Sequence, residues 1–260
     1  MSAATRARLA ALLGTPDPDL AELNLLVSAE AEPRLDVAAQ LDRVERLASA
    51  AAERGNGAEG VLAVMRGTGL RGDIDDYDDP RNSFLDQVLD RRVGIPISLS
   101  ALTIAVARRV GVPLVGIGMP GHFVVSDAGG PDARFWDPFG GWAELGLDDC
   151  ARLVMRTAGV ELEQSHLAPA APREILVRML ANLRSSYARR GLLRDAFWTV
   201  ELARIAMPAD ESLAREHVAL LTALGRYDEA EAVLEEFPGG DAARRAKELE
   251  VIRDLQRRRN

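Results

Sequence analysis

A histidine and an aspartate in the middle of the chain are the residues best suited to nucleophilic or acid–base chemistry. His122 follows a glycine at the start of an apolar run, and Asp137 lies between a tryptophan and a proline. Upstream of both, the run Gly94-Ile-Pro96 introduces a stretch without helix breakers. A helix N-terminus and a neighbouring imidazolium stabilise a thiolate, and a carboxylate orients the imidazole. These positions are therefore the first candidates for a reactive centre.

The segments that must position these residues are predicted to change from helix to strand and back to helix along the chain. Proline is tolerated at the first helical position, so Pro96 predicts a helix over 97–109 that ends at a Gly-Val-Pro run. Three short apolar runs follow at 114–118, 122–125 and 134–136, separated by turns rich in glycine and proline, and they predict three strands. Further helices are predicted over 82–92 and 147–157. The fold class is therefore α+β.

The two ends of the chain are predicted to be helical. Apolar residues recur at spacings of three and four from residue 3 to 66, and the chain is again helical from residue 172 onward. Within this second region, Gly191 and Ala196 recur at one constant offset as Gly225 and Ala230. A period of about 34 residues resembles the tetratricopeptide repeat. We expect three parts: an N-terminal helical segment, a core and a helical repeat, at 1–70, 71–165 and 172–260.

The order of helix, histidine and aspartate resembles the core of the transglutaminase-like superfamily. That superfamily has a cysteine at a helix N-terminus, a histidine on one strand and an aspartate on the next. The resemblance implies a papain-like core, with a central helix on a small antiparallel sheet, in which His122 is the base and Asp137 orients it. Aligning on Gly111-Val-Pro113 puts the nucleophilic cysteine at Pro96, which has no nucleophile.

Two longer runs narrow the resemblance. Residues 78–100, DDPRNSFLDQVLDRRVGIPISLS, and residues 120–125, PGHFVV, are similar to SirB-type bacterial proteins, which join this core to a tetratricopeptide-like tail. The similarity implies a cleft beside the histidine and the aspartate. Its expected lining is Asn82, Pro96, Ser98 and Trp136, with Tyr77, Arg81 and Asp90 beside it.

Serine is the alternative nucleophile on the predicted central helix. Ser98 lies about 200° around the helix from Pro96 and points away from the cysteine's face. Ser100 is at about 40° from Pro96 but roughly 6 Å further along the axis. Small polar residues on a buried face more often bond a backbone carbonyl, so a structural role is favoured for both. Cys150, the single cysteine, follows the motif on another helix and is expected to be a core thiol.

Composition excludes several classes of partner. The net charge of −8 repels nucleic acid, and no apolar run approaches the roughly 20 residues of a membrane span. One cysteine allows no internal disulfide and fits a reducing, cytoplasmic location.

Two motifs that could suggest a cofactor fail. The acidic stretch Asp73–Asp79 lacks the spacing of a calcium-binding loop, and Gly116–Gly121 leads into a strand rather than into the helix that a nucleotide site needs. Neither a metal nor a nucleotide cofactor is therefore expected.

The sequence therefore favours a transglutaminase-like protein without the catalytic cysteine, acting as a binding, scaffolding or regulatory protein for a protein or peptide partner. The alternative is a hydrolase or acyltransferase that uses Ser100, or a water activated by His122 and Asp137.

Overall fold

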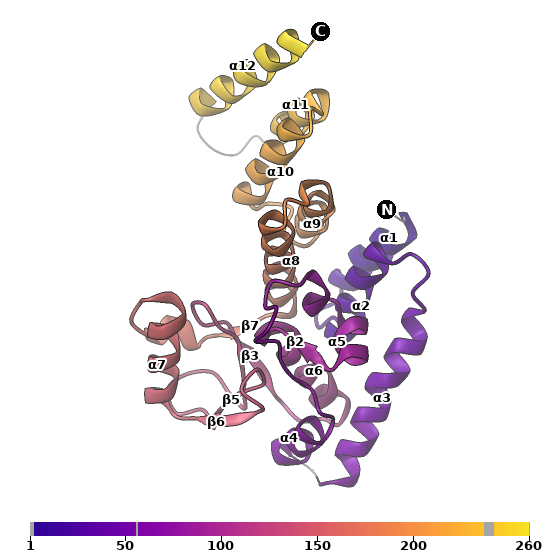
Figure 1. Ribbon diagram of the computed structural model, residues 1–260, viewed down its shortest axis with the longest axis vertical. Helices are drawn as coiled ribbons and strands as arrows, with labels where there is room; N and C mark the ends of the chain where they lie inside the picture. Colours follow the sequence, from indigo (N-terminus) through magenta and orange to yellow (C-terminus); the bar gives the residue numbers. More distant parts are fainter. Residues whose placement is uncertain (1–2, 56, 237–241, 260) are drawn as a thin grey trace. The chain divides into compact units, whose positions relative to one another are not determined.

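The computed structural model describes residues 3–55, 57–236 and 242–259. The chain divides into two compact units, Met1–Met179 and Leu180–Asn260, each of which is described by itself. The first unit begins with four helices, as the apolar spacing predicts (Figure 1). They are α1 (Ala3–Leu13), α2 (Leu20–Ala31), α3 (Val37–Glu53) and α4 (Ala58–Gly67).

The central helix of the first unit is α6 (Pro96–Arg109). Its start at a proline is confirmed, and it ends before Gly111, whose positive φ of 69° suits glycine. Helices α2, α3 and α4 pack against α6, which also contacts a strand of the sheet. Eleven of its residues are buried, from Pro96 to Ala107. A helix that is covered on all sides must satisfy every polar group within the protein.

The main sheet is antiparallel and has five strands in the order β6-β5-β4-β3-β7. Three of them overlap the predicted apolar runs. The other two were not predicted, because β6 is mostly exposed and β7 has only two residues. Their bounds are β3 (Val115–Ile117), β4 (Val124–Ser126), β5 (Phe135–Asp137), β6 (Ala143–Leu145) and β7 (Pro169–Ala170).

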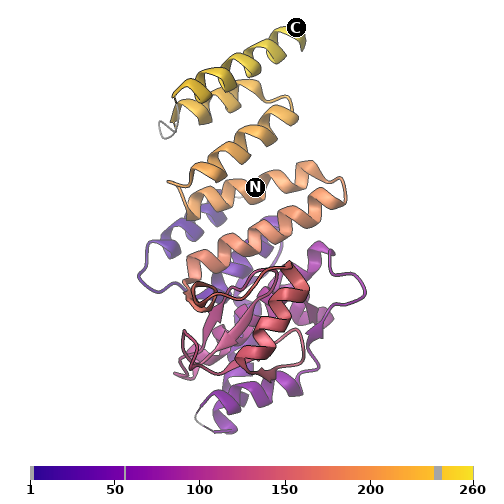
Figure 2. The ribbon, with the colours of Figure 1, turned by 90° about the vertical axis from the view of Figure 1, so that its left-hand side faces the viewer.

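Side chains alternate along each strand, so the sheet has two faces, and apolar residues of other elements pack on both. Val125 and Trp136, which are paired across β4 and β5, belong to the same core cluster as residues of α6. Val124 and Phe135 point to the other face, where they pack against α7 (Leu147–Ala158). Figure 2 shows α7 in front of the strands. The α+β prediction, with a central helix on a small antiparallel sheet, is confirmed.

Two sequence predictions need correction near the sheet. Residues 82–92 form no continuous helix: a 3-10 turn, η1 (Pro80–Ser83), is followed by α5 (Leu85–Arg91), because Phe84 between them is extended. His122 lies in the turn before β4 rather than on a strand, since Gly121 adopts a left-handed φ of 69° and delays strand pairing to Val124.

Short elements complete the first unit. The strands β1 (Arg71–Gly72) and β2 (Val93–Gly94) pair in parallel. This pairing places the residues that precede the acidic stretch beside the start of α6. A second 3-10 turn, η2 (Gln164–Leu167), precedes β7. Helix α8 (Pro172–Arg189) begins in the first unit, where Ile175 and Met179 pack with Phe123, and it ends in the second.

The second unit is helical and repeats one kind of turn at the offset that the sequence shows. Gly191 and Gly225 have φ of 72° and 71°, and Leu192 and Arg226 donate to the carbonyls of Tyr187 and Leu221 in the same kind of turn. The offset expected from the sequence is therefore present in the turns. The helices after α8 are α9 (Leu193–Ala206), α10 (Glu211–Ala223), α11 (Tyr227–Glu236) and α12 (Ala242–Arg259).

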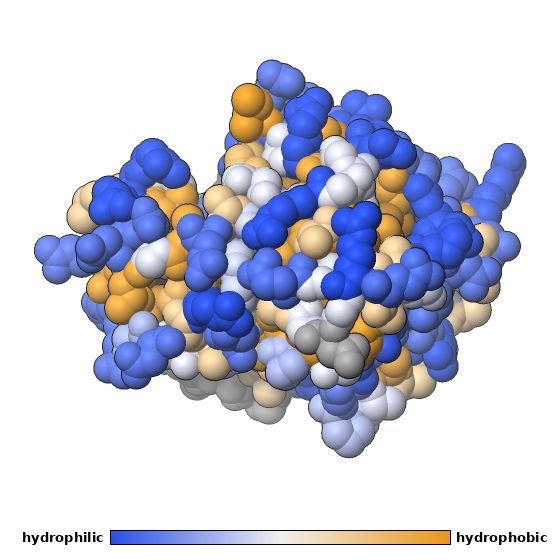
Figure 3. Space-filling view, turned by 90° about the horizontal axis from the view of Figure 1, so that it is seen from below, coloured by the Kyte–Doolittle hydropathy of each residue, from blue (hydrophilic) through white to orange (hydrophobic). Residues whose placement is uncertain are grey.

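The face of the molecule seen from below in Figure 3 is mostly hydrophilic, with apolar residues in scattered patches. Scattered apolar residues are normal on a protein surface. Across residues 3–55, 57–236 and 242–259, no helix combines the length and the hydropathy that crossing a bilayer requires.

Candidate functional site

His122 and Asp137 lie within hydrogen-bond distance of each other. Nε2 of His122 is 2.9 Å from Oδ1 of Asp137, and the two side chains are only 6% and 13% exposed. The same carboxylate oxygen accepts the backbone N–H of Phe139 at 3.1 Å. Among the residues that the structure describes, none forms a hydrogen bond with Nδ1 of His122. The carboxylate therefore orients the imidazole and leaves one ring nitrogen available.

Glycines keep this pair in place. The left-handed turn at Gly121, next to His122, lies against the end of α7, where a Cβ added to Gly121 would come within 2.8 Å of Oγ1 of Thr157. An added Cβ at Gly140 would lie 2.8 Å from Oδ2 of Asp137. Close approach of the backbone on both sides thus confines the histidine and the carboxylate.

An aromatic side chain covers the histidine ring. Phe139 contacts His122 edge-on, with ring centroids 6.1 Å apart, and contacts Tyr77 at 5.9 Å. Gly72 lies against the ring of Phe139, since a Cβ added to Gly72 would come within 2.6 Å of that ring. Tyr77 is 43% exposed, so the acidic stretch contributes the outer part of this aromatic contact.

The start of α6 carries no free nucleophile. Pro96 is buried at the first helical position. Oγ of Ser98 donates to the carbonyl of Asn82 at 2.7 Å and accepts the N–H of Ile95 at 3.1 Å. Oγ of Ser100 makes a long hydrogen bond, 3.5 Å, to the carbonyl of Phe123. Both hydroxyls are fully buried and bonded to the backbone rather than to the histidine.

Trp136, expected to line the cleft, is fully buried in the core beside α6. The alternation of β5 directs it there and directs Asp137 to the opposite face. Its ring faces the guanidinium of Arg134 at 5.0 Å, and its Nε1 has no hydrogen-bond partner among the described residues. Trp142 is also buried in this core, where its Nε1 donates to Oγ1 of Thr103 at 3.0 Å.

Asn82 belongs to a buried polar network below the acidic stretch. Its amide donates to the carbonyl of Asp76 at 2.8 Å and accepts Nη1 of Arg91 at 3.0 Å. The other guanidinium nitrogen of Arg91 lies 3.4 Å from Asp73 and 3.3 Å from Asp79. Through Ser98, this network is tied to the start of α6, so it helps to fix that end of the helix.

The network makes both carboxyls more acidic. Burial raises the pKa of Asp73, but hydrogen bonds from the Asp76 N–H and from Asn82, together with the charge of Arg91, lower it by more. Burial likewise raises the pKa of Asp79, and hydrogen bonds from Arg81 and the charge of Arg91 outweigh it. The net shift is downward for each, so both are ionised when folded.

Sequence reasoning missed Arg91 and Phe139 as neighbours of the site. Arg91 stands in a run of charged residues whose long-range partners cannot be read from spacing, and Phe139 resembles an ordinary turn residue. Of the residues expected beside the cleft, Arg81 pairs with Asp79, but Asp90 pairs with Arg43 of α3 and is mostly exposed. Buried carboxylates require a cationic partner, and a search for that partner among the nearby arginines could have identified Arg91.

Cys150 is a core thiol, as predicted. It is free and fully buried on α7, in the cluster formed with Val124 and Phe135. Burial, with the charges of Asp149 and Asp137, raises its pKa to about 11. At neutral pH it is protonated and unsuited to nucleophilic attack.

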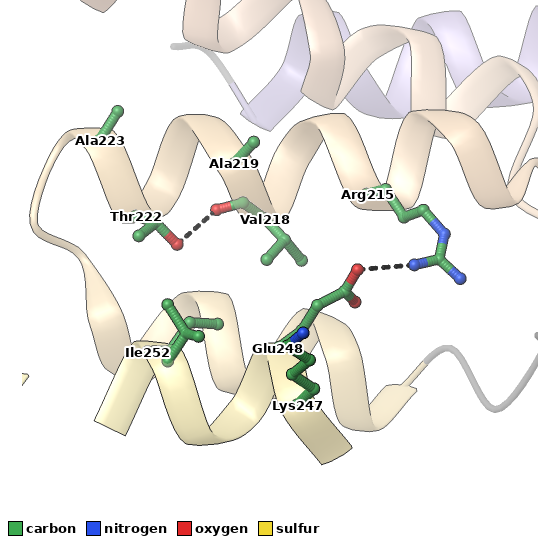
Figure 4. A pocket seen from close by; sticks show the side chains of 9 residues that line it. Arg215, Val218, Ala219, Thr222, Ala223, Lys247, Glu248 and Ile252 are labelled. Atoms are coloured by element: carbon green, nitrogen blue, oxygen red, sulfur yellow. Dashed lines mark hydrogen bonds and ion pairs between the residues drawn. The ribbon is translucent and has the colours of Figure 1, made fainter. Parts of the chain in front are cut away.

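The second unit has a candidate binding surface of its own. An apolar cavity of about 690 Å³ lies between α10 and α12 (Figure 4). Val218, Ala219 and Ile252 form part of its wall, and Val251 is 52% exposed at it. At one end, Arg215 bonds Glu248 at 2.8 Å. The surface has the composition that suits an apolar side chain with a charged group at one end.

Comparison with known proteins defines the class. Residues 34–181 match the family described as the transglutaminase-like superfamily. The matched segment contains the central helix, the sheet and the His122–Asp137 pair, and it makes up more than half of the chain. The chain therefore belongs to the transglutaminase-like superfamily.

Within it, the chain is similar to bacterial proteins of the uncharacterised group UPF0162. The UPF0162 protein PA3419 of Pseudomonas aeruginosa is 32% identical over 216 residues, which cover 78% of each chain. A UPF0162 protein of Xylella fastidiosa strain 9a5c is 44% identical over 125 residues, which are 46% of this chain and 44% of that protein. The match thus spans less than half of the Xylella relative.

The chain is also similar to part of a eukaryotic protein. Human F-box only protein 21 is 32% identical over 141 residues, which are 49% of this chain and 22% of that protein. No solved structure matches the chain.

The buried network predicts a pH-dependent loss of stability in Arg91→Met. Removing the guanidinium leaves the buried carboxylate of Asp73 without a cationic partner and leaves Asp79 with Arg81 alone, which costs about 3 kcal/mol near pH 7. Because the folded pKa values are lowered, this stabilisation is present above the unfolded pKa of about 4 and is lost as the pH falls through the folded values. Urea unfolding at several pH values measures the difference from the wild type.

Arg152→Met is the matched control, because Arg152 pairs with Asp149 where both side chains are largely exposed. Its loss should leave the free energy of unfolding nearly unchanged, since exposed ion pairs are screened by solvent. A difference between Arg91→Met and the wild type that stays constant from pH 7 to below the carboxyl pKa would contradict the network.

Proposed function

We propose that this chain is a non-catalytic member of its superfamily that binds a protein or peptide partner. The observation that carries the proposal is the state of α6, whose first residue is Pro96 and whose hydroxyls at Ser98 and Ser100 are bonded to backbone carbonyls. A base oriented by a carboxylate acts on a nucleophile only when the nucleophile is within its reach. Here an oriented base is present, and no hydroxyl or thiol of a described residue bonds to it.

Burial argues further against a serine enzyme. Ser100 is fully buried, so an acyl group cannot reach its oxygen without movement of the surrounding core. Thr103, one turn further along, donates to the carbonyl of Leu99 at 2.8 Å and accepts from Trp142. All three hydroxyls on the helix therefore serve packing.

Two surfaces support a binding role. In the first unit, half-exposed Tyr77 leads to Phe139 and then to the histidine, which offers an aromatic contact beside a hydrogen-bonding ring. In the second unit, the apolar cavity between α10 and α12 would accept an apolar side chain of a peptide. Helical repeats commonly bind peptides along their faces.

The narrower assignments belong to the same proposal. The runs at 78–100 and 120–125 support a SirB-type protein, and the matching turns at Gly191 and Gly225 support a tetratricopeptide-like region over 172–260. The position of the sheet supports a core at 71–165, and the single buried cysteine supports a cytoplasmic location. The similarity of about half of this chain to 22% of F-box only protein 21 supports the use of the shared part as a module.

A second candidate function is hydrolysis by a water molecule. It is favoured by the 2.9 Å contact between His122 and Asp137 and by Nδ1, which no described residue bonds. An imidazole oriented in this way is a general base that could activate water. This candidate requires the histidine but no side-chain nucleophile.

Restoring the thiol tests whether Pro96 occupies the nucleophile's place. We expect the thiol introduced by Pro96→Cys to ionise about 2 pH units below an ordinary thiol, because the helix N-terminus and the imidazole stabilise the thiolate. The ultraviolet absorbance of the thiolate, followed against pH, measures this. Cys150 does not interfere, since its pKa is raised to about 11.

The control for this titration is Leu147→Cys, at the first position of α7, which provides a helix N-terminus away from the His122 ring. Combining Pro96→Cys with His122→Ala should restore an ordinary pKa. If Pro96→Cys titrates like Leu147→Cys in both backgrounds, the assignment of Pro96 is wrong.

Catalysis itself is tested with His122→Ala. We expect no labelling of the wild type by a fluorophosphonate probe, and no difference between wild type and variant in the hydrolysis of p-nitrophenyl acetate. Labelling of Ser100 that disappears in His122→Ala would overturn the non-catalytic proposal. Hydrolysis that falls in the variant without any labelling would support the activated water instead.

Binding is tested by affinity capture from the native host with wild type and His122→Ala as bait. We expect a defined set of proteins to be retained by the wild type and reduced several-fold with the variant, because loss of the buried ring removes the support of Phe139 and, through it, of the exposed Tyr77. Arg152→Met, which alters an exposed ion pair on α7, serves as the matched bait. Equal recovery with all three baits would argue against a role for the histidine.

A further inference from the structure

The first unit has a cavity of its own, which is lined partly by arginines and does not include the residues around His122. It has a volume of about 340 Å³ and lies where α3, the turn after α4 and the end of α5 meet. Three arginines are among the residues that line it, Arg43, Arg46 and Arg92. In a chain with a net charge of −8, such a concentration of positive charge is a local exception.

Two of these arginines have no partner among the described residues. Arg43 is paired with Asp90, so its charge is compensated. In the part of the chain that the structure describes, no carboxylate or backbone carbonyl accepts a hydrogen bond from the side chain of Arg46 or Arg92. Neither therefore serves as a helix cap or an ion-pair partner there, and their donors are open to a ligand.

The backbone of Arg92 points to the same role. Its φ is 58°, a left-handed conformation that costs little only for glycine, and it ends α5 in a position where glycine is common. An unfavourable backbone conformation at a residue whose side chain lines a cavity is a reason to examine function. Here an arginine occupies a position whose backbone conformation favours glycine.

The remaining wall selects the kind of anion. Leu47, Leu70 and Leu89 form an apolar part of the lining. The hydroxyl of Thr68 is already used, because it donates to the carbonyl of Met65 at 2.6 Å. The cavity thus offers two unpaired planar cations and an apolar surface. Guanidinium groups bind phosphate oxygens in a bidentate manner, and two of them match a doubly charged phosphate.

We propose that this arginine-lined cavity binds a phosphate group, either as the free anion or as a monoester of a small apolar group. The positive charge of Arg46 and Arg92 holds the phosphate, and the leucines contact the ester group when one is present. The site involves no residue used in the proposed partner-binding surface, so either can fail without the other.

The experiment is a titration followed by 1H–15N NMR at constant ionic strength, with inorganic phosphate and phenyl phosphate as probes and sodium chloride as the balancing salt. We expect saturable shifts at the amides of Gly67–Leu70 and Arg92. Tighter binding of phenyl phosphate would identify a monoester site, and equal binding would identify a site for the free anion.

The variants are Arg46→Gln and Arg92→Gly. Glycine suits the left-handed position, so Arg92→Gly should fold with unchanged or higher thermal stability. Each loss of a charged hydrogen-bond donor should raise the Kd for phosphate by about 10-fold or more. Arg46→Lys, which keeps the charge, should retain part of the affinity.

Arg34→Gln is the control, because Arg34 is exposed on the loop between α2 and α3 and is not part of the cavity lining. It should leave the Kd unchanged. The proposal is overturned if the shifts do not saturate, if they spread over the surface rather than gather at the cavity, or if Arg92→Gly, shown to be folded, binds phosphate as tightly as the wild type.

Discussion

Burial of helix α6 is the constraint on which the rest of the first unit depends. Eleven of its residues are buried between helices α2, α3 and α4 and the sheet, so each polar group on it must find a partner inside the protein. Ser98 bonds the Asn82 carbonyl, Ser100 the Phe123 carbonyl and Thr103 the Leu99 carbonyl. Burial of the helix therefore explains both its close packing and the lack of a free hydroxyl along it.

The same constraint connects the acidic stretch to the site. Ser98 joins the start of α6 to η1, and Asn82 and Arg91 carry the connection to the carboxylates of Asp73 and Asp79. A stretch that looks solvated in the sequence is therefore buried at its two ends, where Arg91 contacts the carboxylates of Asp73 and Asp79. Tyr77, from the exposed middle of the stretch, then reaches Phe139 and the histidine.

His122 and Asp137 keep the arrangement of a base and its orienting carboxylate, while the central helix α6 begins with a proline. A buried imidazole bonded to a carboxylate is also a rigid polar feature, and its glycine neighbours leave it little freedom. Such a pair can survive for packing and recognition as well as for chemistry. Function in this superfamily member thus depends on the site, not on the fold.

The sequence by itself determined the fold class, the start of the central helix at Pro96, and the candidate pair His122 and Asp137. The first two follow from periodicity and from proline and glycine positions, and the pair follows from the resemblance of the residue order to that of the superfamily; all of these signals are local or colinear. The tertiary structure alone decided that Trp136 faces the core, that Asp90 pairs with α3, that Arg91 joins two carboxylates, and that Arg46 and Arg92 share a cavity. Those facts depend on which side chains distant in sequence meet in space, and no local pattern encodes a meeting of that kind.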